Sequence, residues 1–154
     1  HFGDIFVPPL KQALASFKDS YRAIEYVSPD EDYDKFCANN KENAKRRAMG
    51  VFFINMAGTG FGVELHEAVN VIQDIQALLQ KKIDEEGQEA TVDELASLEG
   101  EIVLGGKAQL AMVEEWEEIT ETIARFAKMK ARDHTSLTNK TVFKHMDIQD
   151  ALNK

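Results

Sequence analysis

Residues 64–87 read ELHEAVNVIQDIQALLQKKIDEEG, and this stretch decides the fold class of the chain. Its main apolar residues recur every three or four positions, with charged and amide side chains between them: Leu65, Ala68, Ile72, Ile75 and Leu79. That spacing predicts an amphipathic helix, and Gly87 is suited to end it because glycine is favoured just after a helix C-terminus. No part of the sequence alternates apolar and polar residues between turn residues, as a half-buried strand would.

The sequence on both sides of this stretch repeats the helical spacing. Further helices are predicted for residues 10–27, from Ser28 onward, for residues 91–132 and for residues 142–152. Two prolines close residues 1–9, which are expected to form an extended lead-in. At the other end, residues 133–154 are predicted to hold a polar connector and a short last helix that buries Phe143, Met146 and Ile148.

Capping motifs and glycines set the expected ends of these helices. Ser28 and Thr91 are each followed three residues later by Glu, which predicts a capping box at each position. Gly105 and Gly106 predict a kink or a break, because two glycines inside a helix cost about 2 kcal/mol relative to alanine. Short connectors favour antiparallel neighbours. We therefore expect residues 1–154 to form one all-α domain, an antiparallel bundle of four to five helices.

Residues 48–63, AMGVFFINMAGTGFGV, contain no charged side chain. In the first interpretation they are the inner end of the second helix, surrounded by other helices, followed by a glycine-rich apolar turn. These 16 residues are fewer than the roughly 20 that an ordinary transmembrane helix needs. The alternative is a concealed, membrane-active apolar hairpin, because Phe52, Phe53 and Phe61 among glycines resemble in composition a fusion peptide or the tongue of a helical pore-forming toxin.

The overall charge and the cysteine content exclude several classes of protein. A formal net charge of −9 repels phosphate backbones, so no nucleic-acid partner is expected. The single cysteine, Cys37, excludes an intramolecular disulfide. The chain therefore fits either the cytoplasm or a secreted protein that folds without disulfides, and the compartment stays open.

No combination of residues points to catalysis, to a cofactor or to a metal. His66, His134 and His145 have no Asp or Glu three or four residues away, the spacing that would place two metal ligands on one helix face. The acidic run that begins at Asp30 lacks the glycine and the final glutamate of a calcium-binding loop. We therefore expect a protein that is not an enzyme and that has no cofactor.

Two charged groups suggest a role in association. Four acidic residues define an acidic strip: Glu114, Glu117, Glu118 and Glu121. Three basic residues define a basic patch: Lys45, Arg46 and Arg47. The strip could dock on the patch of another copy, a hypothesis based on charge matching.

Two other routes to a partner stay open at this stage. The apolar seams of residues 10–24 and 112–126 could form a dimer interface instead of an internal core. The expected function is thus a non-enzymatic helical-bundle module that acts through protein–protein contact or self-association. The alternative is a membrane-active helical protein that uses residues 48–63.

Overall fold

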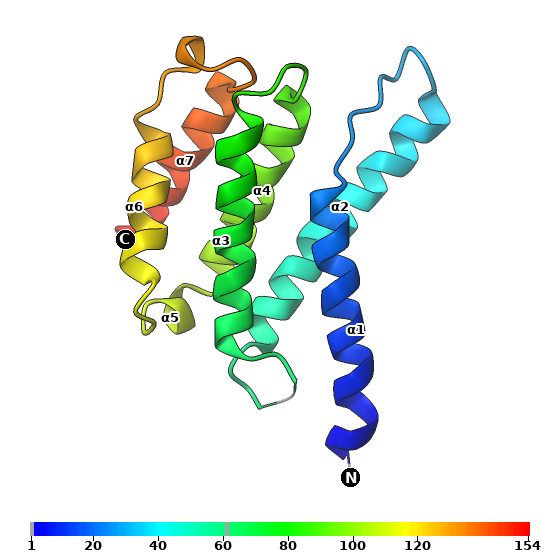
Figure 1. The fold of residues 1–154 in the computed structure, drawn as a ribbon, viewed down its shortest axis with the longest axis vertical. Coiled ribbons are helices and arrows are strands. Elements are labelled where there is room, and N and C mark those ends of the chain that lie inside the picture. Colours follow the sequence, from blue (N-terminus) through cyan, green and yellow to red (C-terminus); the bar gives the residue numbers. More distant parts are fainter. Residues whose placement is uncertain (1, 61) are drawn as a thin grey trace.

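The computed structural model describes residues 2–60 and 62–154, with side chains from Pro9 onward, and this part of the chain contains no strand. It contains α-helices and one short 3-10 helix, which Figure 1 shows in chain order. The elements are α1 (Phe2–Arg22), α2 (Tyr33–Met56), α3 (Leu65–Lys82), α4 (Glu89–Gly105), α5 (Lys107–Leu110), α6 (Trp116–Ala127), η1 (Ala131–Asp133) and α7 (Asn139–Leu152). The predicted all-α class is confirmed.

Helix α4 packs against three other long helices: α2, α3 and α7. Figure 1 shows α3, α4, α6 and α7 side by side, with α1 and α2 together at one side of them. The described residues form seven α-helices instead of four to five, because residues 91–132 do not belong to one interrupted helix. Gly106 separates α4 from α5, as the two glycines predicted, and a turn separates α5 from α6.

The apolar seams predicted from the sequence face the interior. In α3, Ile72, Ile75 and Leu79 are fully buried, and α4 and α6 contribute similar rows. In α1, Leu14 and Phe17 are also buried within the chain. The seams of residues 10–24 and 112–126 are therefore parts of an internal core, and their use as a dimer interface is wrong. The predicted seam also begins too early, because Met112 lies in the turn before α6 with 78% of its surface exposed.

The expected extended lead-in over residues 1–9 is wrong for the described residues, because α1 begins at Phe2 and continues through Pro8 and Pro9. Each proline lacks the amide N–H that would bond a carbonyl one turn earlier. Its φ is nevertheless fixed near −65°, which is a helical value, so the chain keeps its helical course at the cost of two hydrogen bonds.

The capping box predicted at Ser28 does not form. Residues 28–32 make a turn in which the Glu31 and Asp32 amides both donate to the Ser28 carbonyl at 3.2 Å. Helix α2 begins after this turn, where Asp32 Oδ1 accepts from the Lys35 amide at 3.0 Å. Aspartate is as good an N-cap as serine, and Asp32 caps a helix that the local turn has displaced along the chain.

The capping box predicted at Thr91 is also wrong, because α4 begins earlier, at Glu89. Thr91 is buried inside the first turns of the helix, and its hydroxyl donates to the Ile24 carbonyl at 3.4 Å. The side chain that would have capped α4 instead joins it to the segment that follows α1. A tertiary contact thus replaces the local one.

The last helix, α7, is longer than predicted and faces differently. It begins at Asn139, and Thr138 caps it by accepting from the Thr141 amide at 3.1 Å. Ile148 is buried as expected, whereas Phe143 is 57% exposed and Met146 is 40% exposed. The buried row of α7 runs one residue out of phase with these two side chains, through Thr141, Val142, His145 and Ile148.

Candidate functional site

The apolar stretch of residues 48–63 is divided between α2 and a turn. Helix α2 continues to Met56, and Gly58, Gly60 and Gly62 then adopt φ values of 79°, 87° and 102°, in the left-handed region that favours glycine. The predicted glycine-rich turn after the second helix is therefore confirmed. It reverses the chain before α3 and places the end of α2 near the start of α3 (Figure 1).

Of the three phenylalanines predicted as interaction residues, the two that the structure describes differ in burial. Phe53 is 4% exposed and packs against Phe17, with ring centroids 5.4 Å apart. Phe52 is 41% exposed. Phe61 lies outside the described residues. Because Ile54 is also buried, one side of the helical part of this stretch belongs to the core, and the side that carries Phe52 is exposed.

Two glycines allow α2 to approach α4 closely. A Cβ atom at Gly50 would lie 2.9 Å from Ile102 Cγ1, and one at Gly106 would overlap Ile54 Cγ1. Real carbon atoms do not approach this closely, so both positions are restricted to glycine in the present packing. The close contact explains why this part of α2 has small and apolar residues on the side that faces α4.

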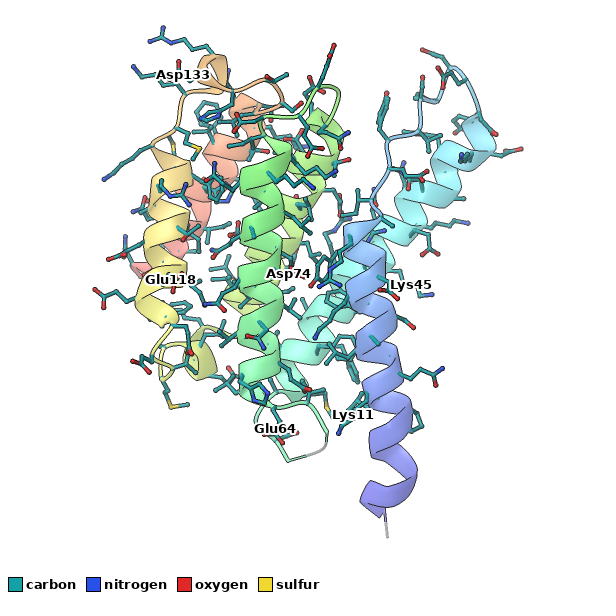
Figure 2. The ribbon with its side chains drawn as sticks, viewed as in Figure 1. Lys11, Lys45, Glu64, Asp74, Glu118 and Asp133 are labelled. Carbon is teal, nitrogen blue, oxygen red and sulfur yellow. The ribbon has the colours of Figure 1, made fainter. Side chains whose placement is uncertain are left out.

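The basic patch does not exist as a continuous exposed surface. Lys45 is exposed beside α1 (Figure 2), whereas Arg46 is only 7% exposed and donates from Nε to Ser20 Oγ at 2.8 Å. Arg47 donates from Nη1 to Glu94 Oε1 at 2.5 Å. Neighbouring helix positions differ by about 100°, so Arg46 faces α1 and Arg47 faces α4. The three residues of the predicted patch therefore point to solvent, to α1 and to α4.

The acidic strip is exposed as predicted. Glu117, Glu118 and Glu121 lie on α6, and Glu114 lies in the turn before it. Figure 2 shows Glu118 pointing away from the other helices. Within the part of the chain that the structure describes, Lys45 is the one residue of the basic patch that is both exposed and without an ion pair. It is therefore the one member of the patch that an acidic strip could bind.

A buried polar centre joins α3, α4 and α7, and the sequence did not predict it. Glu99 and His145 are both fully buried, and Gln76 is 6% exposed. His145 Nε2 lies 2.6 Å from Glu99 Oε1, and Gln76 Nε2 donates to Glu99 Oε2 at 2.9 Å. His145 Nδ1 lies 2.8 Å from the Thr141 carbonyl oxygen. Every polar atom of the His–Glu pair therefore has a partner.

The hydrogen bonds fix the position of one proton in this centre. A carbonyl oxygen only accepts, so His145 Nδ1 carries a proton that it donates to Thr141. Burial lowers the pKa of His145, but the hydrogen bond and the charge of Glu99, together with the Thr141 carbonyl, raise it by more. A protonated His145 donates from Nε2 to Glu99 Oε1 in this geometry. With both side chains fully buried, no substrate reaches them, and the centre holds three helices in register.

The sequence does contain a weak signal for these residues. Glu99 lies four residues after Leu95 and three before Ile102, and His145 lies three residues from both Val142 and Ile148. Polar side chains at such positions fall on the buried face of their helices. The spacing predicts burial, but the partners come from separate helices and only the fold brings them together.

A groove lies between α4 and α7. It encloses about 500 Å³ and is lined by Asp93 and Ser97 on α4 and by Lys140, Phe143, Lys144 and Asp147 on α7. Phe143 is the most exposed aromatic side chain on α7. Because an exposed aromatic residue beside a groove is typical of a binding surface, this region is the candidate interaction site.

The exposed side of α7 has a regular charge pattern. Its first half carries Lys140 and Lys144, its second half carries Asp147 and Asp150, and Phe143 and Met146 lie between the charged ends. We call these six residues the α7 face. Among the described residues, none of the four charged members has an oppositely charged partner within 4 Å.

Metal-binding and membrane-crossing features are both missing from the described residues. No three His, Cys, Asp or Glu side chains in residues 2–60 and 62–154 are grouped so that they could hold a metal ion. In the same part of the chain, no helix has both the length and the apolar composition that a membrane crossing requires. Comparison with known protein families, with curated proteins and with solved structures finds no match to this chain.

Proposed function

We propose that this chain is a non-enzymatic module, an antiparallel helical bundle that associates with a second copy of itself through the α7 face. The observation that carries the proposal is the charge pattern of that face. A basic first half and an acidic second half, with apolar side chains between them, are complementary to the same face rotated by 180°.

The register of such a contact follows from the spacing. If two α7 helices lie antiparallel about a two-fold axis near residue 145, Lys140 of one copy faces Asp150 of the other. Phe143 then lies near Met146 and Asp147 of the second copy. The apolar residues meet at the centre of the contact and the charges form its rim, which is the usual arrangement of a protein interface.

The charge pattern lowers the stability of α7 within a single chain. Lysines near a helix N-terminus and aspartates near its C-terminus oppose the helix dipole, each at a cost of about 0.3–1 kcal/mol. Like charges four residues apart, such as Lys140 and Lys144, add a few tenths of a kcal/mol. No ion pair within the described chain offsets these costs, and an antiparallel partner would.

The size of the face sets the expected affinity. Helix α7 has 14 residues and is therefore about 21 Å long, shorter than needed for the roughly 800 Å² per partner of a standard interface. Asp93 and Ser97, which line the groove beside α7, would add to the contact. We expect a weak dimer, with a dissociation constant on the order of tens of micromolar.

Two charge-reversal variants test the proposal by sedimentation velocity across a concentration series. Lys140→Glu/Lys144→Glu makes the α7 face wholly acidic, and Asp147→Lys/Asp150→Lys makes it wholly basic. Each variant alone is expected to be monomeric at concentrations where the wild type dimerises. An equimolar mixture is expected to form a 1:1 heterodimer, because opposite faces then meet.

The matched control is Glu117→Lys/Glu118→Lys, which reverses two charges on the acidic strip. It should dimerise like the wild type. If it instead abolishes dimerisation, the acidic strip and not the α7 face forms the interface. A wild-type chain that remains a monomer at millimolar concentration contradicts the proposal, and so does a mixture of the two α7 variants that fails to associate.

The alternative, a membrane-active role for residues 48–63, has weaker support. Its main observation is that Phe52 is 41% exposed within the uncharged part of α2. Phe53 and Ile54 would have to leave the core before they could enter a bilayer, and that requires α2 to separate from α4. Dye release from liposomes tests this role: release by the wild type that Phe52→Asp abolishes would favour it over the dimer.

A further inference from the structure

The strongest feature outside the α7 face is a groove between α1 and α2. It has a volume of about 300 Å³, which is at the lower end of the range for small-molecule sites. Ala13, Phe17 and Met49 give it an apolar wall. Ser20 and Arg46 lie in the polar part of the same groove.

Arg46 is a buried cation whose hydrogen bonds are incomplete. A guanidinium has five N–H donors. One on Nε bonds Ser20 Oγ at 2.8 Å and one on Nη1 bonds Asn43 Oδ1 at 2.7 Å. Within the described residues Arg46 makes no further hydrogen bond, and no carboxylate lies within 4 Å of it. The two donors of Nη2 and one of Nη1 therefore have no protein acceptor.

Two of these donors, those on Nη2, are reached by solvent. In the part of the chain that the structure describes, no fully buried side-chain nitrogen or oxygen lacks a hydrogen-bond partner. Nη2 of Arg46 has no partner, and solvent therefore reaches it, although the residue as a whole is 93% buried. Arg46 is one of the residues that line the groove. A ligand in the groove would meet a guanidinium edge that is already oriented by Ser20 and Asn43.

The local charge favours an anion. Burial lowers the pKa of Arg46, while Glu94 and Glu42 raise it by less, so the cation is held at a cost that a bound anion would reduce. The charged residues that line the groove are Lys45, Arg46 and Glu42, which together carry one net positive charge. The whole chain has a net charge of −9. Guanidinium groups bind planar and tetrahedral oxyanions through paired N–H donors.

We propose that the groove between α1 and α2 binds a small amphiphilic oxyanion, with its carboxylate or phosphate group on Arg46 and its apolar part against Phe17 and Met49. The free hydroxyl hydrogen of Ser20 and the ammonium group of Lys45 add donors to the same head group. The volume limits the apolar part to a short chain or a single ring. This site is independent of the α7 face and of the dimer.

Four probes identify the ligand chemistry by isothermal titration and by the NMR signal of the Arg46 Nε–H group. Octanoate and octyl phosphate carry the two head groups, 1-octanol has the apolar chain alone, and inorganic phosphate has the head group alone. At least one of the two anionic amphiphiles should bind ten times more tightly than 1-octanol and inorganic phosphate, and should shift the Arg46 signal. Binding of neither amphiphile at millimolar concentration overturns the proposal, and equal binding of 1-octanol or of inorganic phosphate overturns the assigned chemistry.

Variants then assign the binding to the groove. Arg46→Met should weaken the binding of the better amphiphile at least tenfold, and an unchanged affinity contradicts the site. If Arg46→Met does not fold, Lys45→Met and Glu42→Gln decide, because both residues line the groove at its solvent side. Lys45→Met should weaken binding and Glu42→Gln should strengthen it, each by about two- to fivefold. Lys41→Met, the matched control on an exposed position of α2, should change neither.

Discussion

The polar centre of Glu99 and His145 and the groove at Arg46 both remove ionisable side chains from water, but they satisfy them to different degrees. In the centre, both nitrogens of His145 and both oxygens of Glu99 have partners inside the chain. In the groove, Arg46 has two partners for five donors. Complete pairing fits a structural role, and incomplete pairing leaves capacity for a ligand.

The apolar residues near the two regions also differ in burial. Around the polar centre, core residues such as Leu95 and Ile119 are fully buried. Along α1, Leu10, Leu14 and Phe17 keep 4–6% of their surface exposed. Helix α1 borders a groove that Arg46 lines, whereas the groove between α4 and α7 is lined by other residues than Glu99 and His145.

The largest expected effect comes from breaking the polar centre. Glu99→Ala leaves His145 Nε2 without its partner in a fully buried site and leaves Gln76 Nε2 with the Ile119 carbonyl as its remaining acceptor. Removal of one partner from a buried ion pair costs about 3–5 kcal/mol, because the other charge stays unpaired. We expect the free energy of unfolding, measured by urea denaturation, to fall by that amount.

Glu101→Ala is the matched control for Glu99→Ala, because it removes an exposed carboxylate from the same helix. It should change the free energy of unfolding by less than about 0.5 kcal/mol. Equal losses in the two variants would show that the buried pair contributes no more than a surface carboxylate. The contrast between the two regions would then have no energetic basis.

The second largest effect on stability is expected where α2 packs against α4. Gly106→Ala places a methyl group against Ile54 Cγ1, where α2 meets the end of α4. Overpacking of this kind costs about 1–3 kcal/mol. At the neighbouring position, Gly105→Ala adds a methyl group whose nearest neighbour is Ile54 Cγ2 at 3.5 Å, an ordinary contact. Thermal unfolding should separate the two variants, and equal melting temperatures would contradict the close approach of α2 and α4.

The sequence predicted the regions unequally, for a physical reason. Apolar spacing predicted the helical class, and glycines predicted the break at Gly105 and Gly106 and the turn after α2, because each depends on local chain chemistry. The helix starts at Ser28 and Thr91 were wrong, because a local turn displaced one and a bond to Ile24 replaced the other. Capping rules describe an isolated helix, and the neighbouring turn and the tertiary contact moved the starts of α2 and α4.

The candidate sites were harder to predict than the fold. Lys45, Arg46 and Arg47 are adjacent in the sequence, but their helix positions point them to solvent, to α1 and to α4. Phe143 was expected in the core, and its exposure depends on which side of α7 the buried His145 occupies. The phase of an amphipathic helix with polar residues on its buried side is ambiguous until its neighbours are known.

The pH dependence of stability tests the polar centre without removing it. The raised pKa of His145 means that the folded chain binds this proton more tightly than the unfolded chain, whose histidines titrate near about 6.5. The contribution to the free energy of unfolding is therefore complete below pH 6.5 and is lost as the pH rises through the raised pKa of the folded state. Urea denaturation from pH 5 to pH 9 should show this decline in the wild type and not in His145→Gln. The same slope in both would assign the decline to other groups.

Arg46→Met should have the smallest effect on stability, although it removes a side chain that is nearly as buried as Gln76. The variant loses two hydrogen bonds, each with a net value of about 1 kcal/mol, but it also removes the cost of burying a cation that has no carboxylate partner. The acceptors left behind, Ser20 and Asn43, are only partly buried and regain water. We expect a change within about 1 kcal/mol in urea denaturation. A loss as large as that of Glu99→Ala would mean that Arg46 is a structural residue like His145, with no donors to spare for a ligand.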